Sequence, residues 1–375
     1  MARILIEART MALGGGPAVY ARELVRALAA LPAAHQFTLL VSDAADAVFL
    51  RGSGWPVIAA GWRWRGWQPL WDEWLVPRAA RGFDLLHTTK NVAPPAWGGP
   101  TVTTLHDLSP LVHPELSAPV ERWYWSRQMR LVPARARQII TVSATERQRI
   151  IAGLGVPAAQ VAVTPLGVDE RFLAVAAPAA LAAVRAKYRL PQRFLLNVGT
   201  VSVKKNIPVM LDALTHTRAQ QPDLPPLVVV GRPGHGIPER WPEWVIRIPQ
   251  TGHDELQPLY QAATMLLFPS RFESFGLPVV EAMASGCPVI ISDSSALPET
   301  AGDAALTAGV DDAAGLAAAV LRVWRDADLR ARLSVDGRTR AAGFTWTACA
   351  RATLRLYETC LAQPEGPIKG DILLQ

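Results

Sequence analysis

Short apolar runs alternate with helix-like stretches along the whole chain. In the first half, the apolar runs cover residues 3–7, 37–42, 84–87, 102–105, 138–142 and 161–165, and in the second half residues 194–198, 227–231, 245–248, 265–268 and 288–292. Runs of this length, bounded by turn residues, predict buried strands. Strands alternating with helices predict an α/β fold in which parallel sheets are covered on both faces.

At 375 residues the chain is too long for one ordinary core, so we expect two domains. The first Rossmann-like domain is predicted over residues 1–173, followed by an alanine- and proline-rich linker, residues 174–192. The second domain is predicted over residues 193–344, and helical spacing continues over residues 345–362. Residues 363–375 form a polar tail to which no structure is assigned.

Two glutamates, Glu273 and Glu281, flank the predicted start of a helix near Gly276. Pro278 in the first turn and Gly286 after the last apolar residue mark the two ends of this helix. The free backbone N–H groups at residues 275–277 and the positive end of the helix dipole suit a diphosphate. Carboxylates on either side of that anion can accept hydrogen bonds from the hydroxyls of a nucleotide sugar. A solvated helix face is the alternative interpretation of such a pair.

Lys204 and Lys205 come just before a predicted helix over residues 207–217. Two positive charges at a helix N-terminus oppose the helix dipole unless an anion binds there. The alternative is an exposed basic loop.

Two further groups of residues follow predicted strands of the first half, where binding sites of such sheets collect. His106 and Asp107 follow the strand at 102–105, and an ordinary buried or capping His–Asp pair is the alternative. Gly14, Gly15 and Gly16 follow the first strand and allow close approach of a ligand to the backbone. Val19 stands where a dinucleotide-binding fingerprint requires its third glycine, which disfavours a nucleotide-cofactor oxidoreductase.

These motifs resemble glycosyltransferase family 4, the retaining GT-B enzymes also called group 1 glycosyltransferases. The resemblance rests on the sequence around Glu273 and Glu281, on the 199–206 loop and on His106-Asp107. It implies two Rossmann-like doubly wound domains facing each other across a cleft, with helix 345–362 crossing back to the first domain. The segments at 106–110 and 113–115 look most like bacterial O-antigen and polysaccharide mannosyltransferases.

The resemblance also implies roles for individual residues. Glu281 would bind the ribose of the nucleotide, Glu273 would hold the transferred sugar, and His106 would lie near that sugar. His106 and Glu273 are therefore the predicted catalytic residues. The predicted donor-binding residues are Gly199, Thr200, Lys204, Lys205, Asn206, Arg232, Phe275, Gly276, Leu277 and Glu281, and the predicted acceptor-side residues are Gly14, Gly15, Gly16 and Asp107. Thr200 stands where many relatives carry arginine.

The implied reaction is retaining transfer of a sugar from a nucleotide sugar to a growing, lipid-linked glycan. GDP-mannose is the first expected donor; the alternatives are UDP-glucose or another nucleotide sugar, and a non-catalytic protein that binds sugar nucleotides. Lysines, Arg232 and a helix dipole would neutralise the diphosphate, so neither a metal nor another cofactor is expected. Asp326 and Asp328 have Asp-x-Asp spacing but follow a helical pattern, which indicates a cap.

The net positive charge and the tryptophans are concentrated in the first half. The net charge is +6, and residues 1–171 hold 18 basic against 13 acidic side chains. Residues 61–74 interleave Arg63 and Arg65 with five tryptophans. We expect Trp62, Trp64 and Trp67 to contact an anionic membrane peripherally, whereas Trp71 and Trp74 at helical spacing are expected to pack onto the sheet.

No nucleic-acid-binding module surrounds these residues, so a nucleic acid partner is not expected. Three cysteines without disulfide or metal spacing favour a cytoplasmic protein.

Overall fold

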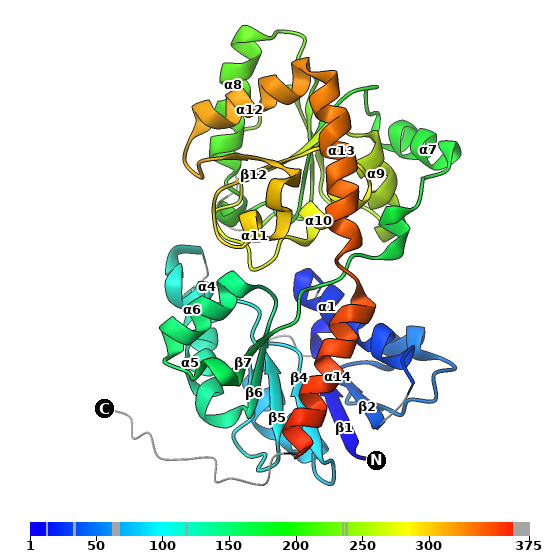
Figure 1. Cartoon of the computed structure of the whole chain (residues 1–375), viewed down its shortest axis with the longest axis vertical. Coiled ribbons are helices and arrows are strands. Elements are labelled where there is room, and N and C mark those ends of the chain that lie inside the picture. The colour runs from blue at the N-terminus through cyan, green and yellow to red at the C-terminus, as the bar shows by residue number, and fades with distance from the viewer. Residues whose placement is uncertain are drawn as a thin grey trace. The chain divides into compact units, whose positions relative to one another are not determined.

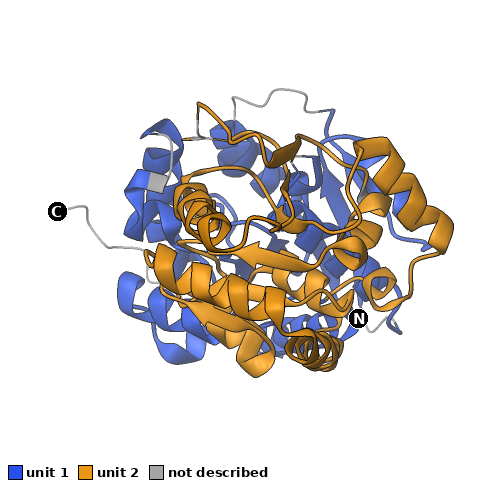
Figure 2. Cartoon of the chain, turned by 90° about the horizontal axis from the view of Figure 1, so that it is seen from above, with its two compact units in different colours: residues 1–167, 346–375 blue, residues 168–345 orange. Residues whose placement is uncertain are grey.

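The computed structural model describes residues 1–12, 14–32, 35–61, 68–116, 119–234, 236 and 239–362. The chain divides into two compact units, each described by itself below (Figure 2). Unit 1 comprises Met1–Gly167 together with Trp346–Gln375, and unit 2 comprises Val168–Thr345. The predicted linker at residues 174–192 is therefore counted within unit 2, and the last helix within unit 1. None of the described helices is long and apolar enough to cross a membrane.

Unit 1 is built on a seven-stranded parallel sheet with the order β3-β2-β1-β4-β5-β6-β7. The strands are β1 (Arg3–Glu7), β2 (Gln36–Val41), β3 (Val57–Ala59), β4 (Leu85–Thr88), β5 (Thr101–Thr104), β6 (Gln138–Thr141) and β7 (Val161–Val163). The helices are α1 (Gly16–Ala29), α2 (Gln68–Leu70), α3 (Val76–Ala79), α4 (Ser109–Val112), α5 (Pro119–Arg135), α6 (Ala144–Leu154) and α14 (Trp346–Ala362), and a π-helical turn covers Trp71–Leu75. Figure 1 shows α1 and α14 on one face of this sheet and α4, α5 and α6 on the other.

Unit 2 is built on a six-stranded parallel sheet with the order β10-β9-β8-β11-β12-β13. The strands are β8 (Leu195–Val198), β9 (Leu227–Val230), β10 (Val245–Ile248), β11 (Met265–Phe268), β12 (Val289–Ser292) and β13 (Leu306–Ala308). The helices are α7 (Pro178–Tyr188), α8 (Ile207–Gln220), α9 (Leu256–Ala262), α10 (Leu277–Ala284), α11 (Leu297–Ala301), α12 (Ala313–Arg325) and α13 (Ala327–Ala342). In Figure 1, α8 and α12 cover one face of the sheet and α9, α10 and α13 cover the other.

The predicted fold class, two doubly wound parallel sheets covered by helices, is confirmed. Central strands such as β8 and β11 are buried along their whole length because helices lie on both faces, which explains their unbroken apolar runs. Two edge strands, β3 and β13, were not predicted. Each has only three residues, fewer than the runs of four or more from which the other strands were predicted.

The order of strands reverses at one point in each sheet. In unit 1 the reversal lies between β1 and β4, and in unit 2 it lies between β8 and β11. In doubly wound sheets the loops on either side of such a point diverge, which leaves a crevice beyond the carboxyl ends of the strands where ligands bind.

Helix α14 joins the sheet of unit 1 through a buried polar contact. The Tyr357 hydroxyl lies 2.6 Å from Nδ1 of His87, a residue of β4. Burial lowers the pKa of His87 to about 3, so this imidazole is neutral. Residues 363–375 lie outside the described part of the chain.

The two tryptophans expected to pack onto the sheet have different environments. Trp71 is fully buried against Leu5 and Leu86, as expected. Trp74 is 61% exposed, so the expectation that it packs onto the sheet is wrong. Residues 71–75 form a π-helical turn, and the wider turn changes the angle between residues three apart. Trp62, Trp64 and Trp67 lie outside the described residues.

Candidate functional site

A buried ion pair lies beyond the carboxyl ends of β8 and β11 in unit 2. Lys205, from the turn after β8, places Nζ 2.7 Å from Oε1 of Glu273, which lies in the loop after β11. The two side chains are 11% and 13% exposed. The Lys205 ammonium also lies 4.1 Å from the ring centroid of Phe268, the last residue of β11. The pair therefore occupies the point at which the strand order of unit 2 reverses.

Charge, as well as burial, controls the ionisation of this pair. Burial would raise the pKa of Glu273, but the positive charges of Lys205 and Lys204 hold it below its usual value. Burial lowers the pKa of Lys205, and the charges of Glu273 and Glu281 oppose that shift. Both predicted glutamates thus act electrostatically on the same ammonium group.

Two glycines allow the loops to come close to this pair. Gly199 follows β8 with φ = 132°, and a Cβ there would lie 2.7 Å from Cε of Lys205. Gly231 follows β9 with φ = 153°, and a Cβ there would lie 1.9 Å from the carbonyl oxygen of Gly199. A side chain at Gly231 would therefore collide with backbone that positions Lys205.

Lys204 and Asn206 connect this loop to its neighbours. The carbonyl of Lys204 accepts a hydrogen bond from the backbone N–H of Arg271, at 2.8 Å, which joins the loops after β8 and β11. Asn206 adopts a left-handed conformation, φ = 54°, and precedes α8. Its Nδ2 donates to the carbonyl of Val310 at 2.6 Å. These contacts support the loop on which Lys205 lies.

The segment before α10 is also ordered by specific contacts. Gly276 has φ = 95° and lies directly before Leu277, the first residue of α10. The carbonyl of Phe275 accepts a hydrogen bond from Oγ1 of Thr300 at 2.6 Å. The backbone N–H groups of the first turn of an α-helix have no partner within the helix. The helix start predicted near Gly276 is therefore present, and the binding of an anion there stays a prediction.

Glu281 lies in α10 and accepts a hydrogen bond from the hydroxyl of Tyr260, at 2.9 Å. Burial raises the pKa of Glu281 to about 7, although Tyr260 and the charge of Arg171 favour the ionised form. Near neutral pH this carboxyl is therefore divided between its protonated and ionised forms.

Thr200 and Arg232 are exposed, and they lie at the same edge of the sheet. The carbonyl of Arg232 accepts a hydrogen bond from the N–H of Val201 at 2.9 Å. Within the described residues the Arg232 guanidinium forms no ion pair or hydrogen bond.

The predicted residues of the first half lie in unit 1. His106 is 7% exposed, and its ring meets Tyr20 edge-on, with centroids 4.9 Å apart. Its Nε2 lies 3.0 Å from the carbonyl of Thr89, which can only accept, so Nε2 carries the proton. Burial lowers the pKa of His106 to about 4. His106 is thus a neutral imidazole with its lone pair at Nδ1.

Asp107 and the three glycines lie in the short segments that precede or begin α4 and α1. Oδ1 of Asp107 accepts hydrogen bonds from the N–H and the hydroxyl of Ser109, at 2.9 and 2.6 Å, which organises the start of α4. Gly14 and Gly15 have φ = 76° and 81°, and Gly16 begins α1. A Cβ at Gly15 or Gly16 would meet nothing within 4 Å, so this loop borders open space.

The structure thus places Gly199, Lys204, Lys205 and Asn206 with Glu273 and Glu281 in unit 2. It places His106, Asp107 and the three glycines in unit 1. Three contributors to the unit 2 site were not predicted: Phe268, Gly231 and Tyr260. Gly231 could have been predicted because it is a glycine at the end of a predicted strand, whereas Tyr260 belongs to no motif.

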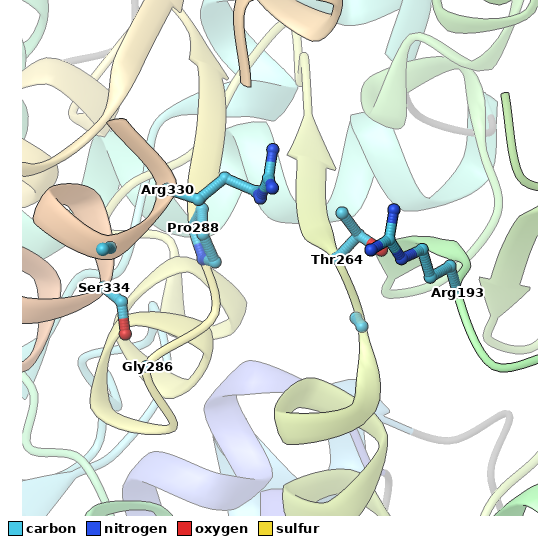
Figure 3. A pocket seen from close by; sticks show the side chains of 8 residues that line it. Arg193, Thr264, Gly286, Pro288, Arg330 and Ser334 are labelled. Carbon is cyan, nitrogen blue, oxygen red and sulfur yellow. The ribbon is translucent and has the colours of Figure 1, made fainter. Parts of the chain in front are cut away.

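A separate pocket of unit 2 lies at the opposite edge of the sheet (Figure 3). Arg193, Thr264 and Pro288, which line it, come before β8, β11 and β12. It therefore opens at the amino ends of the strands and contains none of the predicted donor-binding residues.

Asp326 accepts a hydrogen bond from the N–H of Leu329, at 2.8 Å, and so caps α13. In the part of the chain that the structure describes, no three His, Cys, Asp or Glu side chains are grouped to hold a metal.

Two family models match the chain. Residues 14–172 match the model described as Glycosyltransferase Family 4, and residues 192–326 match the model described as Glycosyl transferases group 1.

Two proteins of similar sequence are also described as glycosyltransferases. The chain is 31% identical over 269 residues to the O-antigen chain mannosyltransferase B of Escherichia coli, covering 68% of this chain and 70% of that protein. It is 31% identical over 332 residues to the D-inositol 3-phosphate glycosyltransferase of Salinispora arenicola, covering 79% and 72%. Among solved structures, Anabaena HepE in complex with UDP-glucose superposes with a TM-score of 0.75 at 17% identity, over 96% of this chain and all of that one.

Proposed function

The chain belongs to glycosyltransferase family 4, the group 1 glycosyltransferases, and on this premise we propose that it transfers mannose from GDP-mannose to a growing, lipid-linked glycan with retention of configuration. The observation that carries the proposal is the buried Lys205–Glu273 pair beside Glu281 at the strand reversal of unit 2. Mannose is the favoured sugar because the chain is 31% identical to an O-antigen mannosyltransferase.

The donor contacts follow from the chemistry of these side chains. Lys205, Lys204 and the N-terminus of α10 attract the diphosphate, and Arg232 at the same edge adds a further cation. Ionised Glu281 accepts hydrogen bonds from ribose hydroxyls, and Glu273 accepts them from the sugar. The cations and the helix dipole neutralise the diphosphate, so the proposed reaction uses neither a metal nor another cofactor.

His106 orients or polarises a sugar hydroxyl and does not serve as a strong base. Its Nε2 is occupied by the carbonyl of Thr89, so only Nδ1 can accept a hydrogen bond from a sugar hydroxyl. In retaining transfer without an enzyme nucleophile, the acceptor hydroxyl attacks the anomeric carbon on the face that the diphosphate leaves. The bond from the anomeric carbon to the phosphate oxygen breaks, and that oxygen takes the acceptor's proton.

A panel of nucleotide sugars tests this proposal. We expect GDP-mannose to stabilise the protein against heat by more than UDP-glucose does, because a ligand at a hundred times its Kd adds about 2.7 kcal/mol.

Mannose transfer to an extract of lipid-linked glycan should persist in EDTA. Loss of transfer on chelation, restored by Mg²⁺ or Mn²⁺, would disprove metal independence. Stabilisation by a nucleotide sugar without any release of nucleotide in the presence of that glycan would instead indicate a binding protein.

We also propose that unit 1 contacts an anionic membrane on the cytoplasmic side, where a lipid-linked acceptor would be held. Helix α5 exposes Val120 and Trp123, at 79% and 68%. The groove beside it is lined by four arginines, Arg122, Arg127, Arg130 and Arg135. Exposed apolar side chains among basic ones suit the headgroup region of anionic lipid.

Liposome flotation tests the membrane proposal. We expect the wild type to float with anionic vesicles at low salt and less at high salt, because each basic side chain near the surface contributes on the order of 1 kcal/mol. The Trp123→Ser variant should float less, and Trp74→Ser, which alters another exposed tryptophan, is the matched control. Equal flotation of wild type and Trp123→Ser would exclude α5 as the contact.

A further inference from the structure

His106 is held at both its backbone and its ring by one short loop, residues 89–91, which follows β4. The backbone N–H of His106 donates a hydrogen bond to Oδ1 of Asn91, at 2.9 Å. The ring Nε2 donates to the carbonyl of Thr89, at 3.0 Å. Thr89, Asn91 and His106 are 0%, 6% and 7% exposed, so both hydrogen bonds are shielded from water. Attachments at the two ends of one residue limit the rotation of its side chain.

This loop is itself fixed to β5, the strand that His106 follows. The N–H of Asn91 donates to the carbonyl of Thr104, the last residue of β5, at 2.8 Å. The carbonyl of Val92 accepts a hydrogen bond from the hydroxyl of Thr103, also in β5, at 3.1 Å. The loop and the histidine are therefore anchored to the same buried strand, and the loop can act as a rigid support.

The backbone of Asn91 lies in the left-handed region, with φ = 48°. Glycine adopts this region without strain and most other residues avoid it, although asparagine enters it more readily than most. Only the oxygen of the Asn91 side-chain amide can accept from the His106 N–H, because the amide nitrogen only donates. Position 91 therefore combines a backbone that suits glycine with a hydrogen-bond acceptor that glycine lacks.

We propose that Asn91 is a positioning residue for His106: it fixes the backbone of His106 so that the ring reaches the Thr89 carbonyl through Nε2 and presents Nδ1 to the sugar. The proposal rests on the proposed glycosyltransferase function and adds to it the residue that sets the direction of Nδ1. Nδ1 forms no hydrogen bond with any described residue. The Tyr20 ring, edge-on to the imidazole at a centroid distance of 4.9 Å, further restricts its rotation. A hydrogen bond that only satisfied a buried N–H would stabilise the fold without orienting Nδ1.

The Asn91→Gly variant removes the acceptor and keeps a residue that tolerates the left-handed backbone. We expect kcat for sugar transfer to fall by about ten- to a hundredfold, because a small misplacement of a reacting group has effects of up to that size. KM for the nucleotide sugar should change by less than about twofold, because the proposed donor-binding residues lie in unit 2. Asn91→Asp keeps an acceptor oxygen and should recover much of kcat.

Arg189→Gly is the matched control. Arg189 ends α7 of unit 2, is exposed, and also has a left-handed backbone, with φ = 52°. It belongs to neither group of predicted site residues, so the same kind of change there should leave kcat at the wild-type value.

A spectroscopic measurement on the full chain separates this proposal from the proposed function. Nitrogen NMR shifts of the histidine rings distinguish a ring protonated at Nε2 from one protonated at Nδ1, and the signal missing from His106→Gln identifies His106. At neutral pH we expect wild type, Arg189→Gly and Asn91→Asp to show the Nε2–H form of His106 alone, and Asn91→Gly to show a mixture of the two forms.

Three results would overturn the proposal. The ring of Asn91→Gly could stay entirely in the Nε2–H form, whatever happens to kcat, or it could change form while kcat stays at the wild-type value. If Asn91→Gly does not fold, a folded Asn91→Asp variant that loses the Nε2–H form would overturn the proposal instead. If the wild type transfers no sugar from any nucleotide donor, the proposed function fails, and the ring signal alone then decides whether Asn91 orients His106.

Discussion

Replacing Lys205 with methionine should lower kcat/KM for the nucleotide sugar by about a thousandfold, because the variant loses the charge contact that we propose between Lys205 and the diphosphate. It should also destabilise the protein. Lys205 and Glu273 lie 2.7 Å apart and are both largely buried, so the variant leaves the Glu273 carboxylate without its partner. Removing one member of a buried pair typically costs about 3–5 kcal/mol. Initial rates and urea unfolding measure the two effects.

Two controls separate lost function from lost folding. The double variant Lys205→Met/Glu273→Gln removes both charges, so it should recover much of the stability and none of the activity. Lys204→Met removes a neighbouring lysine whose ammonium lies 5.1 Å from the Phe272 ring centroid and should have the smaller effect on both quantities. If the double variant is as active as the wild type, Lys205 and Glu273 form a structural pair only. In that case the donor must bind elsewhere.

The affinity for a nucleotide sugar should rise by about tenfold between pH 6 and pH 8, because the ionised fraction of a carboxyl with a pKa near 7 rises from about 10% to about 90% over that range. This follows from the raised pKa of Glu281, about 7, which burial causes. Oε2 of Glu281 already accepts from Tyr260, and a proton on the carboxyl would further reduce its capacity to accept hydrogen bonds from ribose hydroxyls. Isothermal titration calorimetry with GDP-mannose and UDP-glucose measures the change, and Glu281→Gln should abolish it. A tenfold dependence that survives in Glu281→Gln would assign the titration to another group.

The same group predicts the pH dependence of stability. The pKa of Glu281 is higher in the folded protein than its usual value of 4.5, so folding favours the protonated form. Its contribution to stability is complete below about pH 4.5 and is lost as the pH rises through about 7. Glu281→Gln should therefore gain stability relative to the wild type between pH 5 and pH 8. The variant must be compared with the wild type at each pH, because Asp72 and Glu146 also have pKa values raised to about 7 by burial.

The fold and the family could be predicted because both depend on local patterns. Strands buried on both faces produce continuous apolar runs, so β8 and β11 were predicted to within a residue of their observed bounds. Pro278 and the glycines around α10 determine where that helix begins and ends, whatever surrounds it. Glu273 and Glu281 could be selected because several specific residues flank them at fixed spacing.

Contacts between distant segments were not predictable in this way. The hydrogen bond from Tyr260 to Glu281, the near-contact of Gly231 with Gly199 and the hydrogen bond from His106 to Asn91 each join residues many positions apart. Their proximity depends on strand order and on loop paths, which no local pattern encodes. The pKa values of Glu281 and His106 were unpredictable for the same reason, since burial dominates both shifts. Residue types and spacing thus identified the chemistry available to this chain, whereas packing determined which of those groups are charged, which are neutral and which lack a partner.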